Sequence, residues 1–233
     1  MATVLDKPVT DHNRPWYASY QKDGGSGASW AQHGMPALFE RFQSMVMAGP
    51  GGPHLDIGCG NGVKTAQFAR GTMPAVGVDI AFDGLRTASA RGVSAYLLQA
   101  DSVRLPFKSG AFGSASDVLC FTHIPRVQHA AYVREVQRIL APGGRVLLAL
   151  FSLVDEHFHG HPISREYAFR FDPRNPRMAG YEHYEGKVNV HFDQQAIVGT
   201  FGHAFSIEEV REFPHPLYEH RKLWNAILRK PAP

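Results

Sequence analysis

The sequence has little of several features that mark specialised classes of protein. Its 233 residues include two cysteines, Cys59 and Cys120, which are too few for a secreted disulfide framework and match no metal-binding spacing. No apolar run reaches the roughly 18 residues that a membrane helix requires, and the N-terminus lacks the apolar core of a signal peptide. We therefore expect a cytoplasmic protein with no membrane partner.

Long runs of charge are missing as well. Charged residues make up 19% of the chain, and the net charge of +3 comes from scattered lysines and arginines. Because nucleic-acid binding usually needs a basic patch or stripe, we expect no nucleic-acid partner. The length and the 44% hydrophobic content fit one α/β domain better than two. The sequence does not specify an oligomeric state.

Short apolar runs alternate with amphipathic stretches, which is typical of a parallel sheet with crossover helices. Helices are predicted at residues 36–47, 63–70, 82–91 and 127–140. The apolar runs that predict strands are His54–Ile57, Ala75–Asp79, Ala95–Gln99, Gly113–Val118 and Arg145–Leu150. Two later stretches, "FSIEEVREF" and "HRKLWNAILRK", can each supply a further strand.

We expect a single domain, 1–233, in four parts. Residues 1–50 form a polar, glycine-rich N-terminal arm and the first helix, 51–150 form the core, and 196–233 form the final strands. Residues 151–195 carry many aromatic side chains without a clean period, and a connection this long in a compact domain is usually functional or mobile. We therefore predict a lid-like insertion around 151–195, which would shape an acceptor pocket.

The stretch "HLDIGCGNG" is the least ordinary part of the sequence. Its three alternating glycines are Gly58, Gly60 and Gly62. A bare turn from strand to helix lets a ligand approach the backbone, although glycines also occur there for steric reasons alone. A dinucleotide turn would need a glycine at Val63, and Asp56 would repel a pyrophosphate. S-adenosylmethionine instead brings a sulfonium and an ammonium group, which attract that carboxylate.

Four segments resemble, in order, the motifs of class I S-adenosylmethionine-dependent methyltransferases. They are the first three motifs, "LDIGCGNG", "VGVDIA" and "LLQADSVRLPF", and the helix and strand that follow the fourth motif, "AYVREVQRILAPGGRVLLAL". The resemblance covers residues 54–150. It implies a Rossmann-like α/β fold, with a mostly parallel seven-stranded sheet, helices on both faces and an antiparallel last strand. It also implies that S-adenosylmethionine lies across the carboxyl ends of the strands and leaves as S-adenosylhomocysteine.

The resemblance implies cofactor roles for residues in and after these motifs. They are Asp56, Gly58, Cys59, Gly60, Asn61, Gly62, Asp79, Ile80, Asp101, Ser102 and Asp117. Asp79 would accept both ribose hydroxyls, while Asp101 would take the adenine amino group and the backbone of Ser102 a ring nitrogen. Each of these two aspartates could instead be an ordinary N-cap or turn residue.

The fourth motif, "FGSASDVLCFTHIPR", departs from the family pattern. Gly113 stands where an aspartate is usual, and Asp117 stands where a small residue usually ends the strand. A carboxylate there would face the methyl group. It could bind the amino group of the cofactor, hold a substrate hydroxyl or amine, or cap the next turn. His123 is the second catalytic candidate, although a histidine at this place in the family is frequently structural.

Five further residues are candidates for the substrate pocket. They are Trp30, His33, His157, His159 and His161. The first two precede the first helix and could fold over the cofactor or staple that helix. The three alternating histidines would share one face of a strand, but Gly160 and Pro162 argue against a regular strand and no Cys or Asp completes a metal set. We predict no metal, and a solvated loop or a pocket wall there.

Together these features predict an enzyme that transfers a methyl group in line to a nucleophilic O, N, S or C atom of a small molecule, as in natural-product tailoring. Two alternatives stay open. One is a methyltransferase acting on RNA or protein, which salt-dependent binding of RNA would favour. The other is a member that keeps the cofactor but performs another step, such as a cyclisation.

Overall fold

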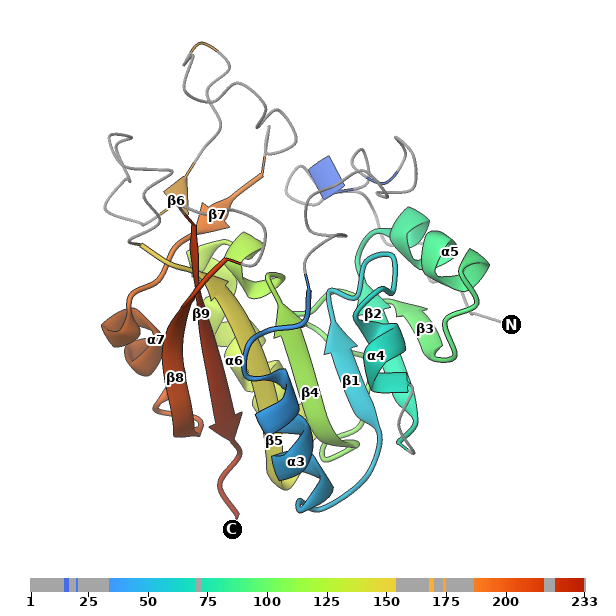
Figure 1. The fold of residues 1–233 in the computed structure, drawn as a ribbon, viewed down its shortest axis with the longest axis horizontal. Helices are drawn as coiled ribbons and strands as arrows, with labels where there is room; N and C mark the ends of the chain where they lie inside the picture. The colour runs from blue at the N-terminus through green and yellow to red at the C-terminus, as the bar shows by residue number, and fades with distance from the viewer. Residues whose placement is uncertain are drawn as a thin grey trace.

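The computed structural model describes residues 34–69, 73–153, 187–215 and 221–232, together with Pro15, Trp16, Tyr20, Ala168, Phe169 and Arg174. A seven-stranded sheet forms its centre, with the strands in the order β3-β2-β1-β4-β5-β9-β8 (Figure 1). These strands are β1 (His54–Ile57), β2 (Ala75–Asp79), β3 (Tyr96–Gln99), β4 (Phe112–Val118), β5 (Leu140–Phe151), β8 (Ser206–Pro214) and β9 (Lys222–Arg229). A separate two-stranded sheet pairs β6 (Ala168–Phe169) with β7 (Asn189–Val190).

Strands β1 to β5 are parallel, and β9 runs antiparallel to both of its neighbours, β5 and β8. The predicted Rossmann-like sheet with an antiparallel last strand is therefore confirmed. The crossover connections bring the carboxyl ends of β1, β2, β3 and β4 to one edge, which is where such sheets bind ligands.

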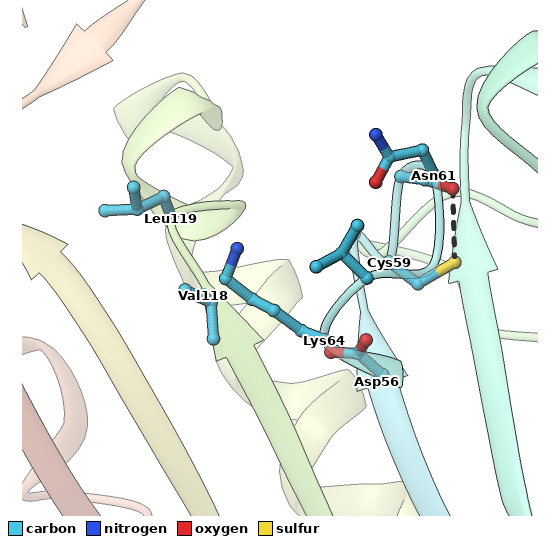
Figure 2. Close-up of a pocket in the computed structure, with 9 residues that line it drawn as sticks. Asp56, Cys59, Asn61, Lys64, Val118 and Leu119 are labelled. Atoms are coloured by element: carbon cyan, nitrogen blue, oxygen red, sulfur yellow. Dashed lines mark hydrogen bonds between the residues drawn. The ribbon is translucent and has the colours of Figure 1, made fainter. Parts of the chain in front are cut away.

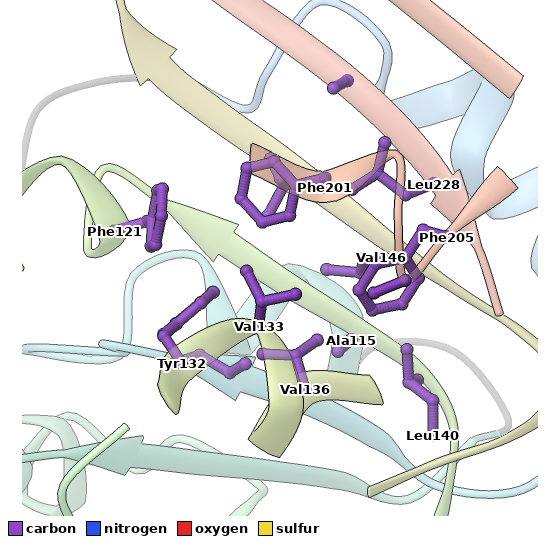
Figure 3. Packing of buried hydrophobic residues seen from close by; sticks show 14 of the residues in the cluster. Ala115, Phe121, Tyr132, Val133, Val136, Leu140, Val146, Phe201, Phe205 and Leu228 are labelled. Carbon is purple, nitrogen blue, oxygen red and sulfur yellow. The ribbon is translucent and has the colours of Figure 1, made fainter. Parts of the chain in front are cut away.

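Helices cover both faces of the sheet, with α3 and α4 in front of it and α6 behind it in Figure 1. The helices of the main domain are α3 (Phe39–Met47), α4 (Thr65–Ala69), α5 (Phe82–Ala90), α6 (Arg126–Ile139) and α7 (Gln194–Phe201), and a 3-10 turn, η2, spans Phe121–His123. Alternate residues of each strand face opposite layers, so that Leu147 packs with α3 and Leu148 with α6. Figure 3 shows Val133 of α6 and Phe201 of α7 in the second of these layers.

Helix α7 and the start of β5 differ from the sequence prediction. Helix α7 was not predicted, and it crosses the expected boundary between the lid and the final strands. It is capped by the Asp193 carboxylate, which accepts a hydrogen bond from the Ala196 backbone at 2.6 Å, and it buries only Ile197 and Phe201. β5 begins at Leu140 rather than Arg145 because Leu140 already pairs with Phe112 before an irregularity in the register.

Candidate functional site

The glycine loop follows β1 at the carboxyl edge of the sheet. Gly58 and Gly60 have φ angles of 71° and 53°, in the left-handed region that side chains disfavour. A Cβ at Gly58 would overlap the side chain of Cys120, and one at Gly60 would overlap the hydroxyl of Tyr20. These two positions therefore require glycine both for conformation and for space.

A pocket lies where β1 and β4 end, with about 390 Å³ of empty space, part of it open to solvent (Figure 2). Its lining residues are Asp56, Gly58, Cys59, Gly60, Asn61, Val63, Lys64, Val118 and Leu119. The pocket thus brings together five of the predicted cofactor residues and four that were not predicted.

Asp56 is the buried carboxylate of the pocket, with 2% of its surface exposed. It accepts hydrogen bonds from Thr65 Oγ1 at 2.6 Å and from Ser116 Oγ at 2.9 Å. Burial raises the pKa of Asp56, whereas the two hydroxyl donors and the Lys64 ammonium lower it. The donors therefore favour a negative charge at the wall of the pocket.

Two polar side chains beside Asp56 complete this wall. Asn61 is 3% exposed, and within the described ranges its Nδ2 has no hydrogen-bond partner, so it can donate to a bound molecule. The amino end of Lys64 extends toward Val118 and Leu119 (Figure 2). Burial lowers the pKa of Lys64, and the Asp56 carboxylate opposes this effect.

Asp79 ends β2 on the other side of the glycine loop. Its Oδ2 accepts a hydrogen bond from Gly60 N and its Oδ1 one from Ala81 N, both at 2.8 Å. Burial raises the pKa of this carboxyl to about 6, against the effect of these backbone bonds. Asp79 therefore tethers the glycine loop. The carbonyl of the next residue, Ile80, accepts a hydrogen bond from Gln99 Nε2 at 2.9 Å.

Asp101 and Ser102 follow β3, the next strand along this edge. The Oδ1 atom of Asp101 accepts a hydrogen bond from Val103 N at 3.1 Å, which is the contact of a turn aspartate. The Ser102 hydroxyl bonds to the thiol of Cys120, whose pKa is nevertheless raised, mainly by burial. Both residues are half-buried.

Asp117, near the end of β4, is not among the residues that line the pocket. Its carboxylate is completely buried and accepts hydrogen bonds from Cys120 N at 2.8 Å, Phe121 N at 3.0 Å and Tyr132 Oη at 2.6 Å. Burial raises its pKa to about 7. Of the three roles considered, the structure favours the cap of the next turn.

His123 lies in an aromatic cluster beside the pocket. Its Nδ1 is 3.0 Å from the Val188 carbonyl, and its ring centroid is 4.5 Å from that of Trp16 and 5.7 Å from that of Phe151. Phe151 packs with Leu119, which lines the pocket. The histidine is therefore close to the pocket but is held there by structural contacts.

The other substrate candidates cannot be compared with the structure. Trp30, His33, His157, His159 and His161 lie outside the described residues, as does most of the predicted lid. Within the described ranges, no three His, Cys, Asp or Glu side chains are grouped so that they could hold a metal ion. In the same ranges, no helix has both the length and the apolar character needed to cross a membrane.

Lys64 and Tyr20 are among the residues of the site that the sequence did not predict. Lys64 stands two positions after the last glycine of the loop, so its place next to the motif was a usable signal. Tyr20, which is 4% exposed, belongs to the N-terminal arm and contacts the loop about 40 residues later, as its clash with a Cβ at Gly60 indicates. No local pattern around Tyr20 predicts this contact.

Comparison with known proteins shows which enzymes this chain resembles. Residues 55–148 match the family model described as a methyltransferase domain. The chain is 26% identical over 167 residues to the demethylmenaquinone methyltransferase of Mycobacterium tuberculosis, which covers 70% of this chain and 69% of that one. A methyltransferase structure from Methanosarcina mazei is similar in fold, with a TM-score of 0.69 and 21% identity over 85% of this chain and 99% of that one.

A second solved structure contains bound ligands. It is the 1,6-didemethyltoxoflavin-N1-methyltransferase of Burkholderia thailandensis, with its substrate and S-adenosylhomocysteine, and it has a TM-score of 0.66 and 17% identity over 97% of this chain and 93% of that one. The family match and the named relatives, together with the fold, show that the protein is an S-adenosylmethionine-dependent methyltransferase. The matched domain and the similar proteins support the class I family of these enzymes, with S-adenosylmethionine as the cofactor.

Proposed function

We propose that this enzyme methylates a nucleophilic oxygen, nitrogen, sulfur or carbon atom of a small molecule. The similar proteins named above support this class of acceptor, since their names specify demethylmenaquinone and 1,6-didemethyltoxoflavin.

The observation that carries the proposal is the pair of carboxylates on either side of the bare glycine loop. Asp56 would attract the sulfonium and ammonium groups of the cofactor, which at partial dielectric contributes a few kcal/mol at most. Asp79 accepts one backbone hydrogen bond on each oxygen, so that lone pairs remain for the ribose hydroxyls. The buried Nδ2 of Asn61 is a spare donor for the cofactor carboxylate.

We further propose that Asp101, Ser102 and Ile80 surround the adenine end of the cofactor. All three residues follow β2 or β3 at the same edge of the sheet as the glycine loop. The acceptor would lie on the side of Leu119, against the rings of His123 and Phe151.

The chemistry depends more on position than on proton transfer. When bound, S-adenosylmethionine supplies an electrophilic methyl group on a positively charged sulfur. Holding an acceptor in line with it can contribute roughly 7–11 kcal/mol, whereas a general base contributes about 10²–10⁴-fold in rate. Asp117 is enclosed by its own hydrogen bonds, so we assign it the role of holding η2 rather than that of a base.

Equilibrium dialysis followed by an acceptor screen tests this function. The protein should retain S-adenosylmethionine and S-adenosylhomocysteine, and the Asp79→Ala variant should lose both. A panel of phenols, quinols, amines and thiols should then include acceptors that release S-adenosylhomocysteine. Turnover only with RNA or protein substrates, or cofactor that is bound but never consumed with any acceptor class, would contradict the proposal.

A further inference from the structure

A row of buried polar side chains crosses the sheet beneath the pocket. The parallel register of β1 and β4 places His54 opposite Ser114 and Asp56 opposite Ser116. Since side chains alternate along a strand, these four share one face of the sheet. Each of them is at most 2% exposed. Such a polar row inside a sheet must satisfy its hydrogen bonds internally.

The four side chains form a continuous hydrogen-bonded chain. His54 Nδ1 lies 2.9 Å from Ser114 Oγ, and His54 Nε2 lies 3.0 Å from Ser116 Oγ. Ser116 Oγ then donates to Asp56 Oδ1 at 2.9 Å. We call Ser114, His54 and Ser116 the relay. It starts inside the sheet and ends on the carboxylate that lines the pocket.

The direction of the donors follows from the charge on Asp56. An ionised carboxylate only accepts, so Ser116 must donate to it and must itself accept from His54 Nε2–H. A neutral imidazole carries one N–H, so Nδ1 then accepts from the Ser114 hydroxyl. If Asp56 were protonated and donated to Ser116, every bond would reverse and the proton of His54 would move to Nδ1.

We propose that the relay positions Asp56 for the charged end of the cofactor, and that the tautomer of His54 follows the charge on Asp56. This inference rests on the proposed cofactor contact of Asp56. Ser116 is a positioning residue here, because it acts on the cofactor only through the carboxylate that it holds. His54 and Ser114 act one and two steps further away.

The surroundings of the relay are consistent with this role. Burial lowers the pKa of His54 to about 3, so its ring stays neutral, and it stacks on Phe68 at a centroid distance of 3.8 Å. Four charged or titratable groups interact electrostatically with Asp56. The ammonium of Lys64, before α4, lowers the pKa of Asp56, and the charge of Asp56 raises the pKa values of Cys59 in the glycine loop, Asp79 on β2 and Asp117 on β4. Of these, the Lys64 ammonium favours the ionised carboxylate.

Nuclear magnetic resonance of the full chain with isotope-labelled histidine tests the direction of the relay. Long-range proton–nitrogen correlations distinguish the two neutral tautomers, and His54→Gln assigns the signal. We expect His54 to be the neutral Nε2–H form at about pH 7. The Nδ1–H form, or a charged ring, at that pH would overturn the proposal. This measurement does not depend on whether the cofactor binds.

A second test measures the affinity for S-adenosylmethionine by calorimetry between about pH 5 and about pH 8. Removing the donor in Ser116→Ala should raise the pKa of Asp56. As the pH falls, binding to the variant should therefore begin to weaken at a pH about one unit higher than binding to the wild type. Between these two pH values the variant should bind about tenfold more weakly. Ser114→Ala keeps the direct donor and should shift the profile less. Ser44→Ala removes a local hydroxyl on α3 and should leave the profile unchanged.

Two outcomes of the second test would overturn the proposal. One is a pH profile of Ser116→Ala that coincides with that of the wild type. The other is a loss of affinity of the same size at every pH, because that indicates a structural defect without a change in the charge of Asp56. A wild-type protein that does not bind S-adenosylmethionine would refute the proposed function instead, and the tautomer of His54 would still decide the relay.

Discussion

The face of the sheet on which a side chain lies decides its role in this protein. Asp56 and Asp117 lie on neighbouring strands, but the register pairs Asp117 with Ile57 rather than with Asp56. The two carboxylates therefore point to opposite faces. Asp56 reaches the pocket, whereas Asp117 caps η2 beneath α6. A sequence alignment shows the strand end but not which of the two faces carries the site.

Gly60→Val should abolish binding of S-adenosylmethionine. A β-branched residue is strained at a φ of 53°, and its Cβ would displace Tyr20 and disturb the loop that Asp79 holds. Calorimetry of the variant measures this loss. Gly199→Ala is the control, because Gly199 lies in α7 with open space around it, and this change should stabilise the helix by about 0.5–1 kcal/mol. Unimpaired affinity in Gly60→Val would count against the proposed site.

Asp117→Asn should alter how stability depends on pH. The pKa of Asp117 is raised from the ordinary 3.8 to about 7 in the folded protein, so the stability it contributes below about pH 4 is lost as the pH rises through 7. The amide keeps an acceptor for the Cys120 and Phe121 backbones and can donate to the Tyr132 oxygen. The variant should therefore gain stability relative to the wild type between about pH 4 and about pH 7, by a few kcal/mol at most.

Chemical denaturation of both proteins at several pH values checks this prediction. The difference between the two proteins is the useful quantity, because three histidines affect the absolute curves in the opposite direction. Desolvation is the main cause of the lowered pKa values of these residues, the buried His54 and His191 and the half-buried His129. A difference that does not vary with pH would show that the Asp117 carboxyl is not shifted in this way.

At the scale of elements, the parallel strands were predictable and α7 was not. β2 and the second half of β5 are short, buried apolar runs that follow turn residues, so the sequence marks where they lie. Helix α7 is only eight residues long and buries two of them, so its apolar period is too brief to distinguish it from a loop. Its N-cap, Asp193, was the only strong local signal.

Helix α7 should nevertheless contribute strongly to stability through Phe201. This side chain is 1% exposed, and its ring centroid is 5.0 Å from that of Phe121, next to the turn that leads from β4. Phe201→Ala should cost about 3–5 kcal/mol of the free energy of unfolding. Val198 lies on the same helix but is 45% exposed, so Val198→Ala should cost less than about 1 kcal/mol. Equal losses in urea denaturation would show that α7 does not pack as described.

At the scale of the whole molecule, the site combines one predictable segment with partners that come from elsewhere in the chain. The glycine loop and Asp79 belong to motifs whose chemistry can be read locally. Leu119 from the end of β4 and Tyr20 from the arm reach the loop only because the topology places them beside β1. Their contacts depend on the packing of distant segments, and no local pattern in one sequence encodes that packing.

Cofactor binding should stabilise the entire fold, because the loop, β2 and β4 that form the site are also the centre of the sheet. A ligand that binds only the folded state adds RT ln(1 + [L]/Kd), which is about 2.7 kcal/mol at a hundredfold excess over Kd. S-adenosylmethionine should therefore raise the melting temperature, while Gly60→Val should melt at the same temperature with and without it. NAD should have no effect on either protein, since Asp56 would repel its pyrophosphate. Stabilisation by NAD but not by S-adenosylmethionine would mean that the carboxylates beside the glycine loop serve a different ligand.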